Sequence, residues 1–329
     1  MVQSFLLAFV ARLSGLRAVA ERCAAWLGTS AFSSLPPALE RASCLAFVRR
    51  LVENLTATHA PDDEDLVAID GMALTLPKTQ RHGCKKYNRR TVGGGVVWAY
   101  QIRAKKNSSP IRVLRLVEGA WHDSKVLRNV CLQPNGPIYL MDRGFYALEL
   151  LAQWLAQGVH FIVRVKAKNL VYQQLRLASR PRLIGKVFLQ YDAVVRLGGE
   201  RAKAHPVVRL LIAVLPSGEK LILATDRFDK SAEAILAAYR QRWHIERFHH
   251  FVKDAVGMAH LYSFDQRGIN FLLYTALLLA LLLFFSQDNP QGETIQILRA
   301  LLKALRAALG LGAPWRRNTY SPRRTKTKK

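Results

Sequence analysis

The spacing of apolar residues separates a helical start of the chain from a strand-rich middle. Apolar positions recur every three or four residues across residues 1–58, with a break near Pro36, and this period predicts helices. Helices are also expected to begin near Asp123 and to span residues 145–157. Short apolar runs between these helices predict strands over residues 66–71, 96–102, 111–117, 137–141 and 160–165.

The second half of the chain changes character twice. Residues 168–225 carry β-branched runs separated by the glycine turn signals at 198–199 and 217–218, which predicts a β-rich segment. One long helix is expected from Ser231 onward. Residues 271–285 are fifteen consecutive apolar residues, fewer than the roughly 20 that cross a bilayer, so a buried helix is favoured over a membrane span.

The predicted elements follow one another in this order: three antiparallel strands, a helix, a strand, a helix, a strand and a long helix. This order fits a ribonuclease-H-like α/β fold. The sequence therefore predicts five segments. They are a helical N-terminal region (1–60), the first part of the core (65–167), a β-rich insertion (168–228), the core's long helix and apolar helix (229–290), and a C-terminal helix with a basic tail (291–329).

The charge of the chain indicates its partner. Lys and Arg outnumber Asp and Glu by 49 to 23, which gives a net charge of +26 and favours binding to a polyanion such as DNA. A basic protein of another kind, such as a ribosome-associated one, remains the alternative. The basic residues are spread along the chain, which disfavours a membrane-surface helix. Four cysteines without a C-x-x-C pair argue against a structural zinc site.

Two predicted strands each end in an aspartate: Asp70 in Ile-Asp-Gly and Asp142 in Met-Asp-Arg-Gly. An aspartate at the end of an apolar strand is costly unless something compensates its charge, and a divalent cation can do so. Taken singly, either residue could instead begin a tight turn. The long helix adds a third carboxylate, Glu246.

Four residues on the long helix, Tyr239, Arg242, Glu246 and Lys253, follow one another in steps of three, four and seven and share one face. A solvated salt-bridged surface could have this pattern, but Leu236, Trp243 and Phe251 indicate that the helix also packs. The same spacing, Tyr-x2-Arg-x3-Glu-x6-Lys, resembles the signature of bacterial transposases of the insertion-sequence-four group.

The motifs around Asp70 and Asp142, and the pair His122–Asp123 between them, are also similar to that group, over about residues 65–285. The resemblance implies a ribonuclease-H-like core in which Asp70, Asp142 and Glu246 are catalytic and hold two Mg²⁺ ions, with Mn²⁺ as an expected substitute. It implies cut-and-paste transposition by a homodimer that joins two transposon ends, in the bacterial cytoplasm at the nucleoid. Residues 1–60 are then the region expected to bind the DNA ends. The side chains expected to bind DNA are Tyr239, Arg242, Lys253, Lys85, Lys86, Arg89 and Arg90.

Two departures from the group are visible. The strand before the long helix ends Thr225–Asp226 where the group often has Thr-Asn, and no Trp lies between Trp154 and Trp243, where hairpin-forming relatives hold a flipped base. Tyr172, Phe188 or Tyr191 could replace that Trp. Two alternatives stay open: another ribonuclease-H-like nuclease, and a repurposed transposase that binds DNA without cutting it.

Overall fold

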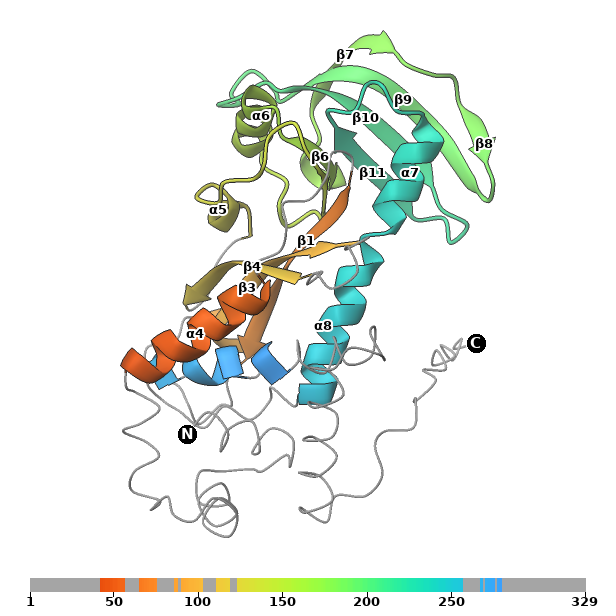
Figure 1. Cartoon of the computed structure of the whole chain (residues 1–329). Helices are drawn as coiled ribbons and strands as arrows, with labels where there is room; N and C mark the ends of the chain where they lie inside the picture. The colour runs from red at the N-terminus through yellow and green to blue at the C-terminus, as the bar shows by residue number, and fades with distance from the viewer. Residues whose placement is uncertain are drawn as a thin grey trace, which may run out of the picture.

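The computed structural model describes residues 42–56, 65–75, 86–87, 90–102, 111–118, 123–256, 267–268, 270–275 and 277–279. Within these ranges the chain forms one mixed sheet with helices on both faces (Figure 1). Its strand order is β2-β3-β1-β5-β6-β11-β10-β9-β7, with β4 paired to β3 and β8 paired to β9.

The first part of the sheet combines antiparallel and parallel pairing. Its strands are β1 (Leu66–Thr75), β3 (Arg90–Gln101), β4 (Ile111–Glu118), β5 (Ile138–Met141) and β6 (His160–Arg164). Strands β4, β3 and β1 are antiparallel neighbours, whereas β1, β5 and β6 run parallel. Parallel neighbours need a crossover, and α6 (Leu148–Gln157) makes the one between β5 and β6. This order is consistent with a ribonuclease-H-like core.

The β-rich segment continues the same sheet. Strand β11 (Lys220–Thr225) pairs antiparallel with β6, and β10 (Val207–Val214) and β9 (Val187–Leu197) follow it outward. Strands β7 (Tyr172–Leu177) and β8 (Arg182–Ile184) both pair with β9. The remaining short elements are β2 (Lys86–Tyr87), α5 (Asp123–Leu127) and the 3₁₀ turn Ala167–Asn169.

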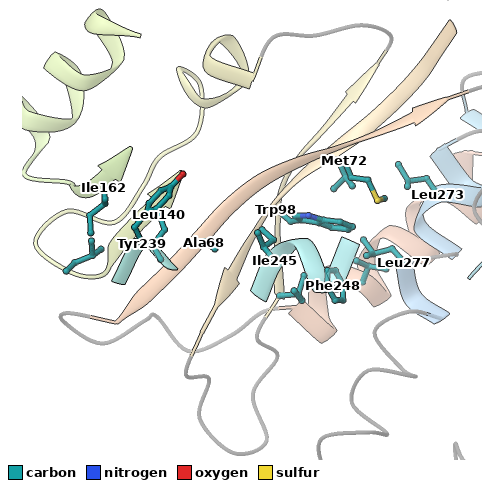
Figure 2. Close-up of a cluster of buried hydrophobic side chains, with 14 of the residues drawn as sticks. Ala68, Met72, Trp98, Leu140, Ile162, Tyr239, Ile245, Phe248, Leu273 and Leu277 are labelled. Carbon is teal, nitrogen blue, oxygen red and sulfur yellow. The ribbon is translucent and has the colours of Figure 1, made fainter. Parts of the chain in front are cut away.

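The central strands β1, β5 and β6 are buried on both faces of the sheet, which explains why they are apolar without strict alternation. In β1, Val67 and Ile69 join α6 in one core, while Ala68 and Met72 join the opposite core. That second core is covered by α4 (Ala42–Thr56), α7 (Ala232–Arg240), α8 (Trp243–Val256) and the helical residues 270–275 and 277–279. Figure 2 shows Trp98 of β3 lying against Ile245 and Phe248 of α8 in this core.

Three sequence expectations need correction. Strand β1 continues to Thr75, so Asp70 lies inside the strand rather than at its end. The long helix is two helices, because Gln241 and Arg242 form a turn in which backbone N–H groups bond to carbonyls three residues earlier. Trp243 is 60% exposed and does not pack as expected.

Two other expectations are met where the structure describes the residues. The helix expected near residue 123 is α5, which begins at Asp123. In the apolar run, residues 271–275 and 277–279 are helical and buried, as a core helix requires. Among the described residues, no helix is both long enough and apolar enough to span a membrane. Residues 1–41 of the predicted helical region lie outside the described ranges.

A buried ion pair joins the β-rich segment to the start of α7. Asp192 of β9 is fully buried and Arg209 of β10 is 7% exposed. Arg209 donates from Nε and Nη2 to both carboxylate oxygens of Asp192, at 2.7 and 2.8 Å. Its Nη1 donates to the carbonyl oxygen of Lys230, just before the helix cap Ser231. The Arg209 side chain thus connects two strands with the loop that begins α7.

Removing Asp192 alone should be strongly destabilising. We expect Asp192→Ala to lower the free energy of unfolding by about 3–5 kcal/mol, because Arg209 is left as an uncompensated buried charge. The double variant Asp192→Leu/Arg209→Met should recover most of that loss. Urea denaturation followed by circular dichroism measures both. A loss of less than about 1 kcal/mol in the single variant, as for a surface pair, would contradict the buried-pair interpretation.

Candidate active site

Two carboxylates and one guanidinium lie side by side on the parallel strands. Ile69 is in register with Met141, and Met141 with Val163. The next residues along these chains are therefore level with one another, and they are Asp70, Asp142 and Arg164. Since Ile69, Met141 and Val163 pack into the core on the α6 side, alternation turns the following three side chains to the opposite face, where α8 lies.

Asp142 keeps one carboxylate oxygen without a hydrogen bond. Its Oδ1 is buried and has no hydrogen-bond partner among the described residues. Arg164 Nη1 is 3.9 Å from this oxygen, close enough for an ion pair but too far for a hydrogen bond. Arg164 Nη2 instead donates to Glu219 Oε1 at 2.5 Å. Sequence reasoning missed Arg164, because one arginine at the end of an apolar strand has no diagnostic spacing.

Glu246 enters the site from α8 and is held by Arg242. Arg242 Nη2 donates to Glu246 Oε1 at 2.6 Å, four residues further along the chain. Arg242 is 9% exposed, and its guanidinium carbon is 5.7 Å from the centre of the Tyr239 ring. Burial acts to lower the pKa of Arg242, but Tyr239, Glu246 and Asp142 favour the charged form, and the net direction is upward. Arg242 therefore remains a cation between Asp142 and Glu246.

Tyr239 completes this side of the site from α7. Its side chain is buried among Leu140, Ile162 and the sheet, as Figure 2 shows. Burial raises the pKa of Tyr239 to about 12, and the charge of Asp142 acts in the same direction. The phenol hydroxyl is thus neutral at physiological pH and lies near enough to Asp142 for their charges to interact.

Asp70 is contacted by a residue that the sequence patterns did not single out. His249, buried at 7% exposure, places its Nδ1 3.4 Å from Asp70 Oδ2. The other oxygen of Asp70 accepts a hydrogen bond from the backbone N–H of Gly71 at 2.9 Å. His249 lies three residues after Glu246, one turn of the same helix, and this spacing is the signal that could have identified it.

The other expected DNA-binding residues are only partly described. Lys253 lies on α8, seven residues after Glu246, Lys86 lies on β2, and Arg90 begins β3. Lys85 and Arg89 fall outside the described residues.

Asp226, the departure noted in the sequence, belongs to the other end of the sheet. Its carboxylate accepts a hydrogen bond from the backbone N–H of Phe161 at 2.8 Å and contacts His160 Nδ1 at 2.6 Å. His160 begins β6, whereas Arg164 ends it beside Asp142, so the Asp226 group is remote from the two central aspartates. Asp226 fastens the end of β11 to the start of β6.

Comparison with known proteins identifies the family. Residues 61–283, more than half of the chain, match the family described as Transposase DDE domain. The chain belongs to this family. Its mixed sheet and its basic charge agree with a DDE transposase domain.

Two named relatives support the assignment. One, from Geobacillus stearothermophilus, is named a probable transposase for insertion sequence element IS5377 and is 25% identical over 157 residues, 48% of this chain and 41% of the relative. Another, y4zB from Sinorhizobium fredii, also carries a transposase name and is 23% identical over 169 residues, 51% of this chain and 47% of the relative. The chain thus spans less than half the length of these relatives.

Membership of the DDE transposase family implies dependence on a divalent metal, and part of the site fits one. Asp70 and Asp142 are level on adjacent strands, and Asp142 has a buried oxygen available to a cation. Glu246 is turned to Arg242, and among the described residues no three His, Cys, Asp or Glu side chains are placed so that they could hold a metal ion. Carboxylates such as those of Asp70 and Asp142 are the ligands that Mg²⁺ or Mn²⁺ prefers, whereas Glu246 Oε1 accepts a hydrogen bond from Arg242.

Ionisation of Tyr239 should lower the free energy of unfolding at alkaline pH. Because its folded-state pKa is about 12 and an unfolded tyrosine titrates near pH 10, its contribution to stability is complete below pH 10 and is lost as the pH rises towards 12. Tyr239→Phe should therefore lose less stability between pH 9 and about 12 than the parent chain. Urea denaturation at a series of pH values measures this difference, and identical slopes for the two proteins would contradict the assigned pKa.

Proposed function

We propose that this chain is a cut-and-paste DNA transposase of the insertion-sequence-four group, which cleaves transposon ends and transfers them to target DNA. The observation that carries the proposal is the placement of Asp70 and Asp142 at one level on parallel strands, facing the helix that bears Glu246. A turn role for these aspartates does not explain why both lie at one level and on the same face of the sheet. The four-residue signature supports the subgroup.

Each carboxylate has a role in this proposal. Asp70, the central one, would hold two Mg²⁺ ions, while Asp142 and Glu246 would each hold one, and Mn²⁺ would be an acceptable substitute. When bound, two such ions supply an activated nucleophile and stabilise the leaving oxygen of an in-line phosphodiester displacement. The remaining chemistry falls to the protein's own cations and hydrogen-bond donors.

Arg242 links DNA binding to the availability of Glu246. Its Nη2 donates a hydrogen bond to Glu246 Oε1 at 2.6 Å. A guanidinium binds a phosphate through the same N–H groups. A DNA phosphate that binds the Arg242 guanidinium would release the Glu246 carboxylate towards Asp70 and Asp142. Tyr239, beside the guanidinium, limits the directions in which Arg242 can turn.

The remaining expected parts belong to the same proposal. DNA is the partner, bound by Lys253 and the basic stretch that includes Lys86 and Arg90, and two copies of the chain join two transposon ends. Residues 1–60 contribute to end recognition, and residues 168–228 form an insertion in the core. The net charge of +26 supports a polyanionic partner.

The test compares the parent protein with Glu246→Gln on DNA from the ends of its own element, with Mg²⁺ present. Cleavage should fall more than about 100-fold, since even outer partners of metal ligands contribute 10–100-fold. End binding should persist, because glutamine keeps the size of the side chain. Glu200→Gln, on an exposed loop, is the matched control and should cleave like the parent.

The outcomes separate the candidate functions. Equal cleavage by the parent and Glu246→Gln would remove Glu246 from the site. End binding without cleavage by either protein would favour a DNA-binding regulator. Cleavage without joining to target DNA would favour a different ribonuclease-H-like nuclease.

A further inference from the structure

Asp70 and Trp98 are directly opposite each other on neighbouring strands. The antiparallel register of β1 and β3 pairs these two residues, so their side chains project from the same face of the sheet. His249 of α8 lies over both. Its ring centre is 5.1 Å from that of Trp98, and its Nδ1 is 3.4 Å from Asp70 Oδ2. Strand, strand and helix therefore meet at one buried imidazole.

The hydrogen bond between Trp98 and His249 determines which ring nitrogen carries the proton. An indole N–H can only donate, and Trp98 Nε1 donates to His249 Nε2. Nε2 is consequently the acceptor, and the proton of the neutral ring lies on Nδ1. That nitrogen is the one facing Asp70 Oδ2, while Gly71 N–H occupies Asp70 Oδ1.

We propose that His249 is a positioning residue for Asp70, and that Trp98 fixes the His249 ring in the tautomer this role requires. Histidine ligands of metal sites are commonly oriented by a carboxylate behind them, and here the order is reversed, with a histidine behind the carboxylate. The arrangement ties β1 to α8 one helical turn from Glu246. The inference rests on the proposed role of Asp70, but its first prediction does not need catalysis.

Nitrogen-15 NMR of histidine-labelled protein tests the tautomer without any activity. His249 should show a protonated Nδ1 and an unprotonated Nε2, and its signals are assigned by their loss in His249→Asn. Trp98→Phe keeps a large ring but removes the donor, so the Nδ1–H pattern should weaken. A proton on Nε2 in the parent protein would overturn the proposal.

Cleavage of end DNA with Mg²⁺ tests the positioning role. Asparagine can place an N–H near the position of Nδ1, whereas glutamine mimics Nε2. His249→Ala and His249→Gln should therefore slow cleavage by about 10–100-fold at saturating DNA, and His249→Asn should recover most of the rate. His250→Ala, at the exposed neighbouring position, is the matched control.

The NMR and cleavage results distinguish failure of the transposase proposal from failure of the positioning role of His249. A parent protein that does not cleave would count against the transposase proposal, while the NMR result would still decide the tautomer. Parent-like cleavage by His249→Ala, or equal losses in the asparagine and glutamine variants, would overturn positioning. If His249→Ala fails to fold, Trp98→Phe takes its place, and several-fold slower cleavage with unchanged end binding is the expected result.

Discussion

Asp70 and Asp142 lie at the same level on adjacent parallel strands, where two carboxylates repel each other. Neighbouring side chains offset this repulsion. Neighbouring strands are about 4.8 Å apart, so carboxylates at the same level on them are close enough for their charges to repel. Arg164 lies beside Asp142, Arg242 interacts with Asp142 and Glu246, and His249 faces Asp70. These groups come from β6, from the turn at Arg242 and from α8, so the electrostatic surroundings of the two aspartates depend on how these elements pack.

The register that creates the repulsion is itself fixed by burial. A shift of β5 by one residue would exchange Met141 and Asp142 between the two faces, placing a carboxylate in the dry α6 core. The helix side has its own constraint, because α7 is attached to the β-rich segment through Arg209 and the Lys230 carbonyl. Helix α8 then follows after the turn at Gln241. The sheet thus holds the aspartates, and its far strands help to hold the helix pair that supplies Glu246.

Part of this arrangement could be predicted from sequence, for physical reasons. Apolar runs predicted the core strands because burial on both faces leaves little choice of residue, and the spacing from Tyr239 to Lys253 located the helix region. Periodicity did not reveal the turn at Gln241, because Tyr239, Arg242 and Glu246 continue the three- and four-residue spacing across it. Arg164 and His249 were missed since their roles come from strand register and helix docking, which pair residues distant in sequence. Trp243 was expected inside because it is large and apolar, yet it is exposed.

The separation of Glu246 from the two aspartates follows from the same electrostatics. A third carboxylate brought to Asp70 and Asp142 without additional positive charge would add to their repulsion, and one oxygen of Asp142 already lacks a hydrogen bond within the described structure. Pairing with Arg242 gives Glu246 a compensating charge in the meantime. In the proposed function, a divalent cation would change this balance at the aspartates, and a DNA phosphate would change it at Arg242. The proposed function therefore couples assembly of the three carboxylates to the arrival of metal and DNA.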